Sequence, residues 1–171
     1  MRGRVSYWLV PVAADKRRLQ RVINEIAARF DAPEFEPHVT LYSGEMDHIE
    51  DAADILEGIA GEFPLVLHSS GMGHSEQFTK TLFMEFAPAF SLNQINDDLK
   101  SFSKAQDEFT LNPHLSLLYA PISRDIREAL VREIVVPKIV RFDSIKAVAT
   151  GDRTQSKSDV ELWQSLAART F

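Results

Sequence analysis

The chain has 171 residues, 44% of them hydrophobic and 26% charged, with a formal net charge of −6 and no cysteine. A chain of this length can bury roughly 70% of its unfolded surface, which predicts one domain over residues 1–171. The lack of cysteine excludes a disulfide scaffold, a thiolate nucleophile and a Cys-ligated metal, and it fits a reducing compartment, so we expect a cytoplasmic protein.

Charge and hydropathy also limit the partners. Long nucleic acid is held through clustered lysine and arginine, which an acidic chain does not favour, whereas a small anionic ligand is compatible with it. No apolar run approaches the length of a membrane span. We therefore expect a monomer that takes a small ligand, with no membrane partner and no long nucleic acid.

The chain begins with a predicted strand at 4–10 and an amphipathic helix. Asp15 can cap this helix, and apolar residues recur at helical spacing up to Phe30. Charged residues directly after the short apolar start argue against a signal peptide. Proline then favours an extended approach to a second strand, which Gly44 is expected to end.

The middle of the chain is predicted to hold a second helix and a hairpin. Asp47 and Gly61 indicate the start and the end of the helix. The segments 63–69 and 78–86 are rich in strand formers and predict the hairpin. Residues 71–77 form its expected loop, whose glycines suit it to movement or to contact with a ligand.

The last elements complete two similar halves. Apolar spacing predicts a helix at 88–104, and Ser123 can cap another that runs through Ile134. Three segments follow: one or two strands at 135–149, broken near Asp143, a polar loop at 151–158, and a strand at 160–168, where helix is the alternative. This alternation predicts an α+β fold with two pseudo-symmetric lobes, each a sheet backed by helices.

One pattern occurs twice in the chain: proline, histidine, aliphatic, hydroxyl residue and leucine, at 37–41 and 113–117. Because side chains alternate between the faces of a strand, His38 and Thr40 should point to one side. His114 and Ser116 should do the same in their own strand. Two-fold repetition would place the two histidines across a shared groove.

Two imidazoles across a groove suit phosphodiester hydrolysis. One neutral ring can take a proton from water while the other, protonated, gives one to the leaving oxygen, since a pKa near 6.5 lets both forms exist at neutral pH. The hydroxyl groups of Thr40 and Ser116 can donate hydrogen bonds to the phosphate. No metal or other cofactor is required.

Plainer interpretations exist for each of these residues. A histidine on a strand is more often a packed or surface residue than a catalyst, and this is the interpretation we favour for His48, His68 and His74. Thr and Ser on strands are usually structural. A zinc site lacks an evident third ligand at helical or strand spacing. The repeated context favours chemistry for His38 and His114.

The two motifs resemble the paired His-x-Thr/Ser-x motifs of the two-histidine phosphoesterase superfamily. Within it, the run from 113 to 120 resembles the second motif of the cyclic phosphodiesterases that act on ADP-ribose cyclic phosphate, and the likeness extends to 5–8 and 160–163. The resemblance implies two antiparallel sheets around a central cleft. It also implies metal-independent hydrolysis of ADP-ribose 1″,2″-cyclic phosphate and nucleoside 2′,3′-cyclic phosphates, with the nucleoside 2′-phosphate as product.

The resemblance also assigns roles to residues. His38 and His114 would be the acid-base pair, with Thr40, Ser116 and Tyr119 as phosphate contacts, and Trp8 as a possible cleft wall that stacks on a base or ribose. Trp8 could equally be core. Tyr119 lies an odd number of residues from His114, so it reaches the phosphate only if the strand ends or bulges near Leu118.

Two alternatives stay open beside the cyclic phosphodiesterase. One is an enzyme of the same superfamily that cleaves or joins 2′-5′ linkages at RNA ends, which the acidic charge disfavours. The other is a nonenzymatic module that binds nucleotides in the same cleft. The sequence does not define the physiological substrate, the product isomer, or which histidine is the base.

Overall fold

The computed structural model describes residues 1–102 and 109–171. Its strands are β1 (Gly3–Pro11), β2 (Val39–Met46), β3 (Leu65–His74), β4 (Leu82–Phe86), β5 (His114–Leu118), β6 (Ile139–Ala149) and β7 (Gln164–Thr170). Its α-helices are α1 (Ala13–Phe30), α2 (Ala52–Gly58), α3 (Phe90–Phe102), α4 (Arg124–Glu133) and α5 (Lys157–Glu161), and η1 (Ile49–Asp51) and η2 (Phe78–Lys80) are short 3₁₀ helices.

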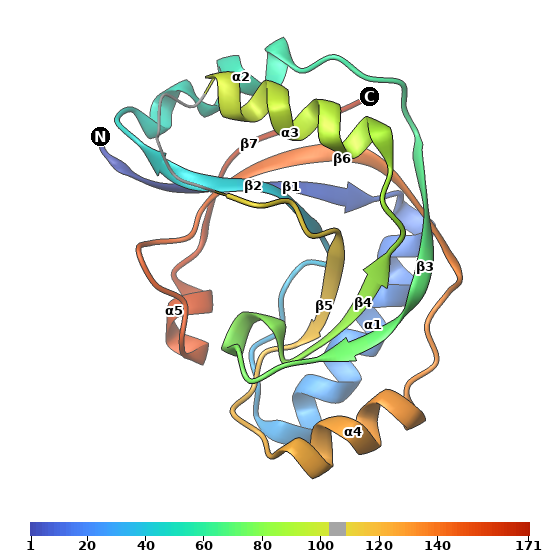
Figure 1. Cartoon of the computed structure of the whole chain (residues 1–171). Helices are drawn as coiled ribbons and strands as arrows, with labels where there is room; N and C mark the ends of the chain where they lie inside the picture. Colours follow the sequence, from blue (N-terminus) through green and yellow to red (C-terminus); the bar gives the residue numbers. More distant parts are fainter. Residues whose placement is uncertain (103–108) are drawn as a thin grey trace.

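The strands form one antiparallel sheet in the order β1-β2-β5-β4-β3-β6-β7, and β1 also pairs with β6. Six strands therefore form a closed circuit, and Figure 1 shows how strongly the sheet curves. The bridge from β2 to β5 is the single register pair Val39 with Leu115. Since each is the residue directly after a motif histidine, this bridge brings the two motifs side by side.

Helices cover the outside of both lobes, as the α+β prediction requires. In Figure 1, α2 and α3 lie over β1, β2, β6 and β7, while α1 and α4 lie against β3, β4 and β5. Helix α1 comes from the first half of the chain but packs on β5 of the second. The α+β prediction of antiparallel strands backed by helices is confirmed.

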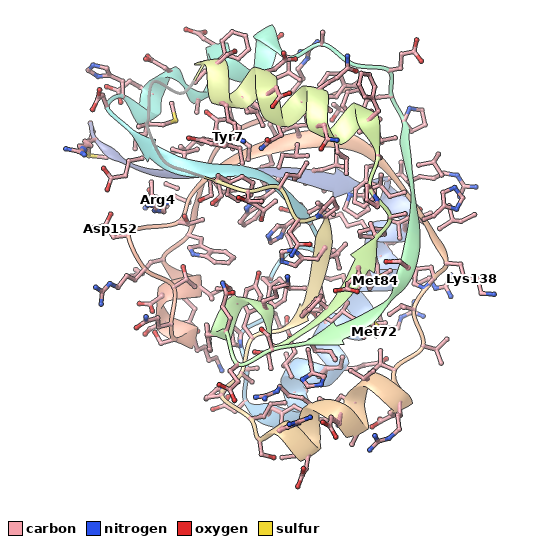
Figure 2. All side chains as sticks on the ribbon, in the orientation of Figure 1. Arg4, Tyr7, Met72, Met84, Lys138 and Asp152 are labelled. Carbon is pink, nitrogen blue, oxygen red and sulfur yellow. The ribbon has the colours of Figure 1, made fainter. Side chains whose placement is uncertain are left out.

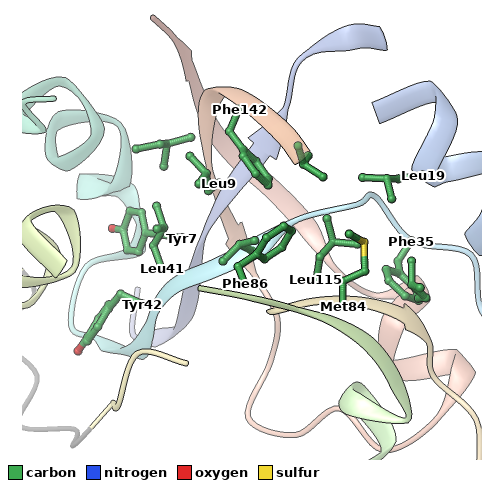
Figure 3. Close-up of a cluster of buried hydrophobic side chains, with 14 of the residues drawn as sticks. Tyr7, Leu9, Leu19, Phe35, Leu41, Tyr42, Met84, Phe86, Leu115 and Phe142 are labelled. Atoms are coloured by element: carbon green, nitrogen blue, oxygen red, sulfur yellow. The ribbon is translucent and has the colours of Figure 1, made fainter. Parts of the chain in front are cut away.

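The core lies between the helices and the back of the sheet. Tyr7, Leu41, Phe142 and Leu115 are almost fully buried there and belong to one cluster (Figure 3). The register of β1 with β2 skips Leu41, because Tyr7 pairs with Tyr42 and Trp8 with Thr40. This bulge changes the alternation of β2, so that Thr40 and Ser43 both face the same cleft.

Several predicted boundaries in the first half were wrong. Val12, not Asp15, is the N-cap of α1; the Asp15 carboxylate instead accepts a hydrogen bond of 2.8 Å from the backbone N–H of Arg141. Gly44 lies inside β2. The second helix begins after η1 and ends at Gly58, short of the expected Gly61.

The hairpin is confirmed, but its loop lies later in the chain than the expected 71–77. Residues Gly71 to His74 are the end of β3 and pair with β4, because the register shifts after Ser69 and lets glycine continue the strand. The turn lies at 75–81 instead, and η2 forms part of it. The hairpin therefore presents η2, and not its glycines, to the cleft described below.

The later elements mostly agree with the prediction. Ser123 caps α4 and accepts a hydrogen bond from Ile126 N–H. Strand β6 is one strand through Asp143, where its register with β1 shifts. The final strand is confirmed but begins only at Gln164. Helix α5 (Lys157–Glu161) occupies the end of the expected loop and the start of the expected strand. The expected helix end at Lys104 lies outside the described residues.

Within the described residues, no helix combines the length and the apolar content needed to cross a membrane.

Candidate active site

The six residues singled out from the sequence line a single cleft of about 510 Å³: Trp8, His38, Thr40, His114, Ser116 and Tyr119. His38 lies directly before β2, and His114 is the first residue of β5. The β2–β5 bridge behind them holds both motifs at the cleft floor. In Figure 2, Arg4 and Asp152, which also line the cleft, lie on the open side of the curved sheet.

Both histidine rings are held in the same way. Nδ1 of His38 lies 2.6 Å from the carbonyl oxygen of Glu36, and Nδ1 of His114 lies 2.7 Å from that of Asn112. A carbonyl can only accept, so each Nδ1 carries the hydrogen and donates it. In the neutral ring Nε2 then keeps its lone pair, which is the arrangement that proton transfer requires.

The surroundings of His38 favour the neutral ring. Only 7% of the residue is exposed, and the indole of Trp8 stacks on the imidazole with ring centroids 3.8 Å apart. Burial lowers the pKa of His38 to about 4, although the hydrogen bond to the Glu36 carbonyl opposes this shift. At neutral pH His38 is therefore uncharged and can accept a proton.

The loop before His38 is anchored by the half-buried carboxylate of Glu36. Glu36 binds Lys16 of α1 and also Lys146 of β6, whose Nζ lies 2.6 Å from Oε2. Burial acts to raise the pKa of Glu36, but the hydrogen bonds from the two lysines outweigh it and hold that pKa below its ordinary value. The carbonyl that orients His38 thus belongs to a residue fixed from two sides.

The surroundings of His114 differ. Its ring is half-buried and meets the edge of Phe83 at a centroid distance of 5.6 Å. Burial lowers the pKa of His114, the Asn112 carbonyl opposes the shift, and the positive charge of Lys80 adds to it. Glu85 acts in the opposite direction to Lys80.

The two hydroxyl residues are not equivalent either. Ser116 is buried and donates a hydrogen bond of 2.8 Å to the carbonyl oxygen of Thr79. Thr40 is half-buried, and its hydroxyl makes no hydrogen bond with the described part of the protein. Thr40 is therefore available to a ligand, whereas Ser116 must exchange a protein partner for one.

Tyr119 and Trp8 are both largely buried in the cleft wall. Strand β5 ends at Leu118, as the parity argument for Tyr119 required. The Tyr119 ring stacks on Phe35 with centroids 3.8 Å apart, and its hydroxyl interacts with Ser116. Burial raises the pKa of Tyr119. Trp8 is 4% exposed, so most of its surface already contacts the protein.

No third metal ligand joins the histidines. Across residues 1–102 and 109–171, no group of three or more His, Asp or Glu side chains comes together in a way that could hold a metal ion.

The comparisons with known proteins agree with this geometry. Residues 1–63 match the model of a family described as cyclic phosphodiesterase-like protein. No curated protein sequence matches the chain. The chain is similar in structure to Escherichia coli LigT complexed with 3′-AMP, at 16% identity and a TM-score of 0.62, over 99% of this chain and 98% of LigT.

Two other solved structures cover nearly the whole chain. TT0787 of Thermus thermophilus matches at 12% identity and a TM-score of 0.63, over 98% of this chain and 97% of TT0787. Usb1 of Kluyveromyces marxianus matches at 13% identity and a TM-score of 0.50, over 96% of this chain and 97% of Usb1. The chain therefore has the same fold as these proteins. The resemblance inferred from the paired motifs agrees with this fold and with the family match over residues 1–63.

Three residues of the cleft were missed by sequence reasoning. Trp163 meets Trp8 edge-on at 5.3 Å and donates from its indole to Thr154. Lys80 and Arg153 supply positive charge from two loops that line the cleft. Trp163 lies in a segment that carried the resemblance, but nothing local in the sequence marks Lys80 or Arg153.

Proposed function

We propose that the protein is a metal-independent cyclic phosphodiesterase of the two-histidine type. Its substrates would be ADP-ribose 1″,2″-cyclic phosphate or nucleoside 2′,3′-cyclic phosphates, and the nucleoside product would be the 2′-phosphate. One observation carries the proposal: two histidines face one cleft, and each has its Nδ1 fixed on the carbonyl two residues before it.

The proposed reaction is hydrolysis by acid-base catalysis. Nε2 of one neutral histidine takes a proton from water, the water oxygen bonds to phosphorus, and the ring P–O bond breaks. The other histidine, protonated, gives its proton to the departing ribose oxygen. The hydroxyl groups of Thr40 and Ser116 would bind the non-bridging oxygens, and Tyr119 would assist through its contact with Ser116.

Three considerations support the proposal that the substrate is a small nucleotide. The family description that matches the first 63 residues names cyclic phosphodiesterases, and LigT, which shares the fold, has been crystallised with 3′-AMP and with phosphate. The cleft walls add aromatic surface from Trp8 and Trp163, against which a ribose or base could pack.

A second candidate is an RNA-end phosphodiesterase or 2′-5′ ligase. The observation that favours it is positive charge along the cleft, where Arg4, Lys80 and Arg153 could follow a longer phosphate chain. The net charge of −6 counts against it. Chain-length dependence of the rate separates the two candidates.

The direct test is a panel of substrates given to the purified protein. It contains ADP-ribose 1″,2″-cyclic phosphate, nucleoside 2′,3′-cyclic phosphates and 2′-5′-linked oligonucleotides, with the product phosphate located by NMR. We expect hydrolysis of cyclic phosphates in the presence of EDTA. Binding without turnover of any substrate would instead support the nonenzymatic module.

Substitution of the histidines completes this test. His38→Ala and His114→Ala should each lower kcat/KM by about 10³-fold, since a positioned acid or base contributes 10²–10⁴. His68→Ala is the matched control, because His68 is exposed on β3 away from the cleft lining. Wild-type rates in either cleft variant would refute the acid-base assignment.

A further inference from the structure

We propose that Lys80 is a third phosphate-binding residue of the cleft, its ammonium group contacting a non-bridging oxygen of the cyclic phosphate. This inference rests on the proposed function, because it names a further residue of that same site. Its grounds are the way the protein holds the η2 turn, the contacts of the ammonium group, and the charges around it.

The turn that carries Lys80 is bonded to the second histidine motif on both sides. Ser116 Oγ donates to the Thr79 carbonyl at 2.8 Å. Thr81 Oγ1 donates to the Ala120 carbonyl and accepts from the Ala120 N–H, both at 3.1 Å. The Lys80 carbonyl accepts from Ser75 Oγ at 2.6 Å. When the Ser116 hydroxyl turns from Thr79 to a ligand, the hydrogen bonds of Thr81 and Ser75 still hold the backbone of Lys80 in place beside β5.

The ammonium group is held beside His114 by an aromatic ring. Nζ of Lys80 lies 4.4 Å from the centroid of Phe83, which is the same ring that meets the imidazole of His114 edge-on. The ring of Phe83 thus contacts both the ammonium group of Lys80 and the imidazole of His114, a proposed acid-base residue. Between β4 and β5, Phe83 is also the strand partner of Ser116, a proposed phosphate-binding residue.

The charge of Lys80 lacks an internal counter-ion in the described structure. No carboxylate of residues 1–102 or 109–171 lies within ion-pair distance of its Nζ, although Lys80 lines the cleft. Lys16 and Lys146, by contrast, are both bound by Glu36. A cation that faces a cleft without a carboxylate is complementary to an anion such as phosphate.

Such a contact would be worth more in the transition state than in the ground state. As water attacks, negative charge builds on the non-bridging oxygens, and a fixed cation already in place stabilises that charge without reorganisation. The compact ammonium acts as a point charge, so an arginine in its place should preserve the charge but not the position.

The test compares Lys80→Met with Lys80→Arg and with Lys138→Met. Lys138 is exposed and lies on the opposite side of the molecule from the open side of the cleft (Figure 2), so it controls for the lost charge. With a nucleoside 2′,3′-cyclic phosphate, Lys80→Met should lower kcat/KM by about 10²-fold, mainly through kcat. Lys80→Arg should recover part of this loss, and Lys138→Met should match the wild type.

The pH profile gives a readout that loss of packing alone would not move. Two charged groups act on His114: Lys80, which lowers its pKa, and Glu85, which raises it. Removing the positive charge raises the pKa of His114, so the limb of kcat/KM that His114 controls should move to higher pH in Lys80→Met. In Lys80→Arg it should stay near the wild-type position.

The outcomes are distinguishable from failure of the proposed function. If the wild type is active and Lys80→Met keeps its rate and pH profile, the inference is overturned and the function stands. If the wild type hydrolyses no cyclic phosphate, the function fails. Binding of inorganic phosphate, measured by calorimetry, then decides for Lys80: weaker binding in Lys80→Met alone supports it, and equal affinity overturns it.

Discussion

The two histidine half-sites repeat one local structure in two different environments. In both, proline precedes the histidine, Nδ1 donates to the carbonyl two residues before, and a hydroxyl residue follows two residues later. His38, however, is buried under Trp8, while His114 is half-buried beside Phe83 and Lys80. The motif fixes the orientation of each ring, and the environment sets how readily each ring takes a proton.

A second difference lies in what supports each half-site. The His38 side is tied down by the carboxylate of Glu36 and leaves the Thr40 hydroxyl free for a ligand. On the His114 side, the hydroxyl of Ser116 itself holds the η2 turn. Equivalent substitutions on the two sides should therefore have different consequences. Four experiments test whether the two half-sites differ in this way.

The largest expected effect concerns the proton on His38. Its pKa in the folded protein is about 4, against about 6.5 in the unfolded chain. Between these values the unfolded chain binds more protons, so the stability from this group is full above about pH 6.5 and is lost as pH falls towards 4, by about 3 kcal/mol. Denaturant unfolding of wild type and His38→Asn from pH 7 to pH 4 measures this loss.

The difference in free energy of unfolding between wild type and His38→Asn should shrink as the pH falls through this range. His114→Asn is the comparison variant. Its free energy of unfolding should still fall with pH by the amount that His38 contributes. Parallel curves for wild type and His38→Asn would contradict the burial argument.

The next effect separates the two hydroxyl groups. Thr40→Val should lower kcat/KM by about 10²-fold by removing a phosphate donor, and it should leave the melting temperature unchanged. Ser116→Ala should lower the rate and also the stability, by about 1 kcal/mol, because its hydrogen bond to Thr79 is lost. Kinetics combined with thermal unfolding distinguishes the two. A destabilised Thr40→Val with normal kinetics would reverse the assignment.

Glu36→Gln should have a smaller effect, confined to the His38 side. Looser positioning of the ring should reduce kcat about tenfold. Because the pKa of Glu36 is lowered in the folded protein, its stabilising effect is present above its ordinary pKa of 4.5 and is lost as pH falls through the folded value.

The melting temperature of Glu36→Gln should therefore lie below that of the wild type at pH 7 and approach it in acid. Glu25→Gln, on the exposed face of α1, is the control. A pH-independent difference between Glu36→Gln and wild type would show that the ion pairs with Lys16 and Lys146 are not its cause.

The smallest effect is expected for Tyr119→Phe. The stacked ring remains, and only the hydroxyl that meets Ser116 is lost. We expect a decrease in kcat/KM of a few fold, about 1 kcal/mol or less. A decrease as large as that of Thr40→Val would mean that the Tyr119 hydroxyl binds the phosphate directly.

Much of the fold could be predicted because the signals are local. Apolar periodicity marked α1 and α4, and strand formers marked both arms of the β3–β4 hairpin. The errors occurred where tertiary contacts override local preference. Asp15 could cap a helix but bonds to β6 instead. Gly71 and Gly73 favour a loop by composition, yet pairing with β4 keeps them in the strand.

The candidate site could be predicted as far as its repeated motif extends. Sequence spacing placed each histidine and its hydroxyl on one face, and the family resemblance added Trp8 and Tyr119. All six residues line one cleft. Lys80 and Arg153 could not be found in this way, because each belongs to a segment with no motif, and Trp163 lies in a segment that only the family resemblance marked. They reach the cleft only through the curvature of the sheet.

By itself the sequence determined the side-chain types and their spacing in each half-site, since these belong to short stretches of chain. Only the tertiary structure decided that the halves meet, through the pairing of Val39 with Leu115. It also decided how they differ. Burial lowers the pKa of both histidines, and the charge of Lys80 acts on His114 alone, although the local sequences of the two are nearly the same.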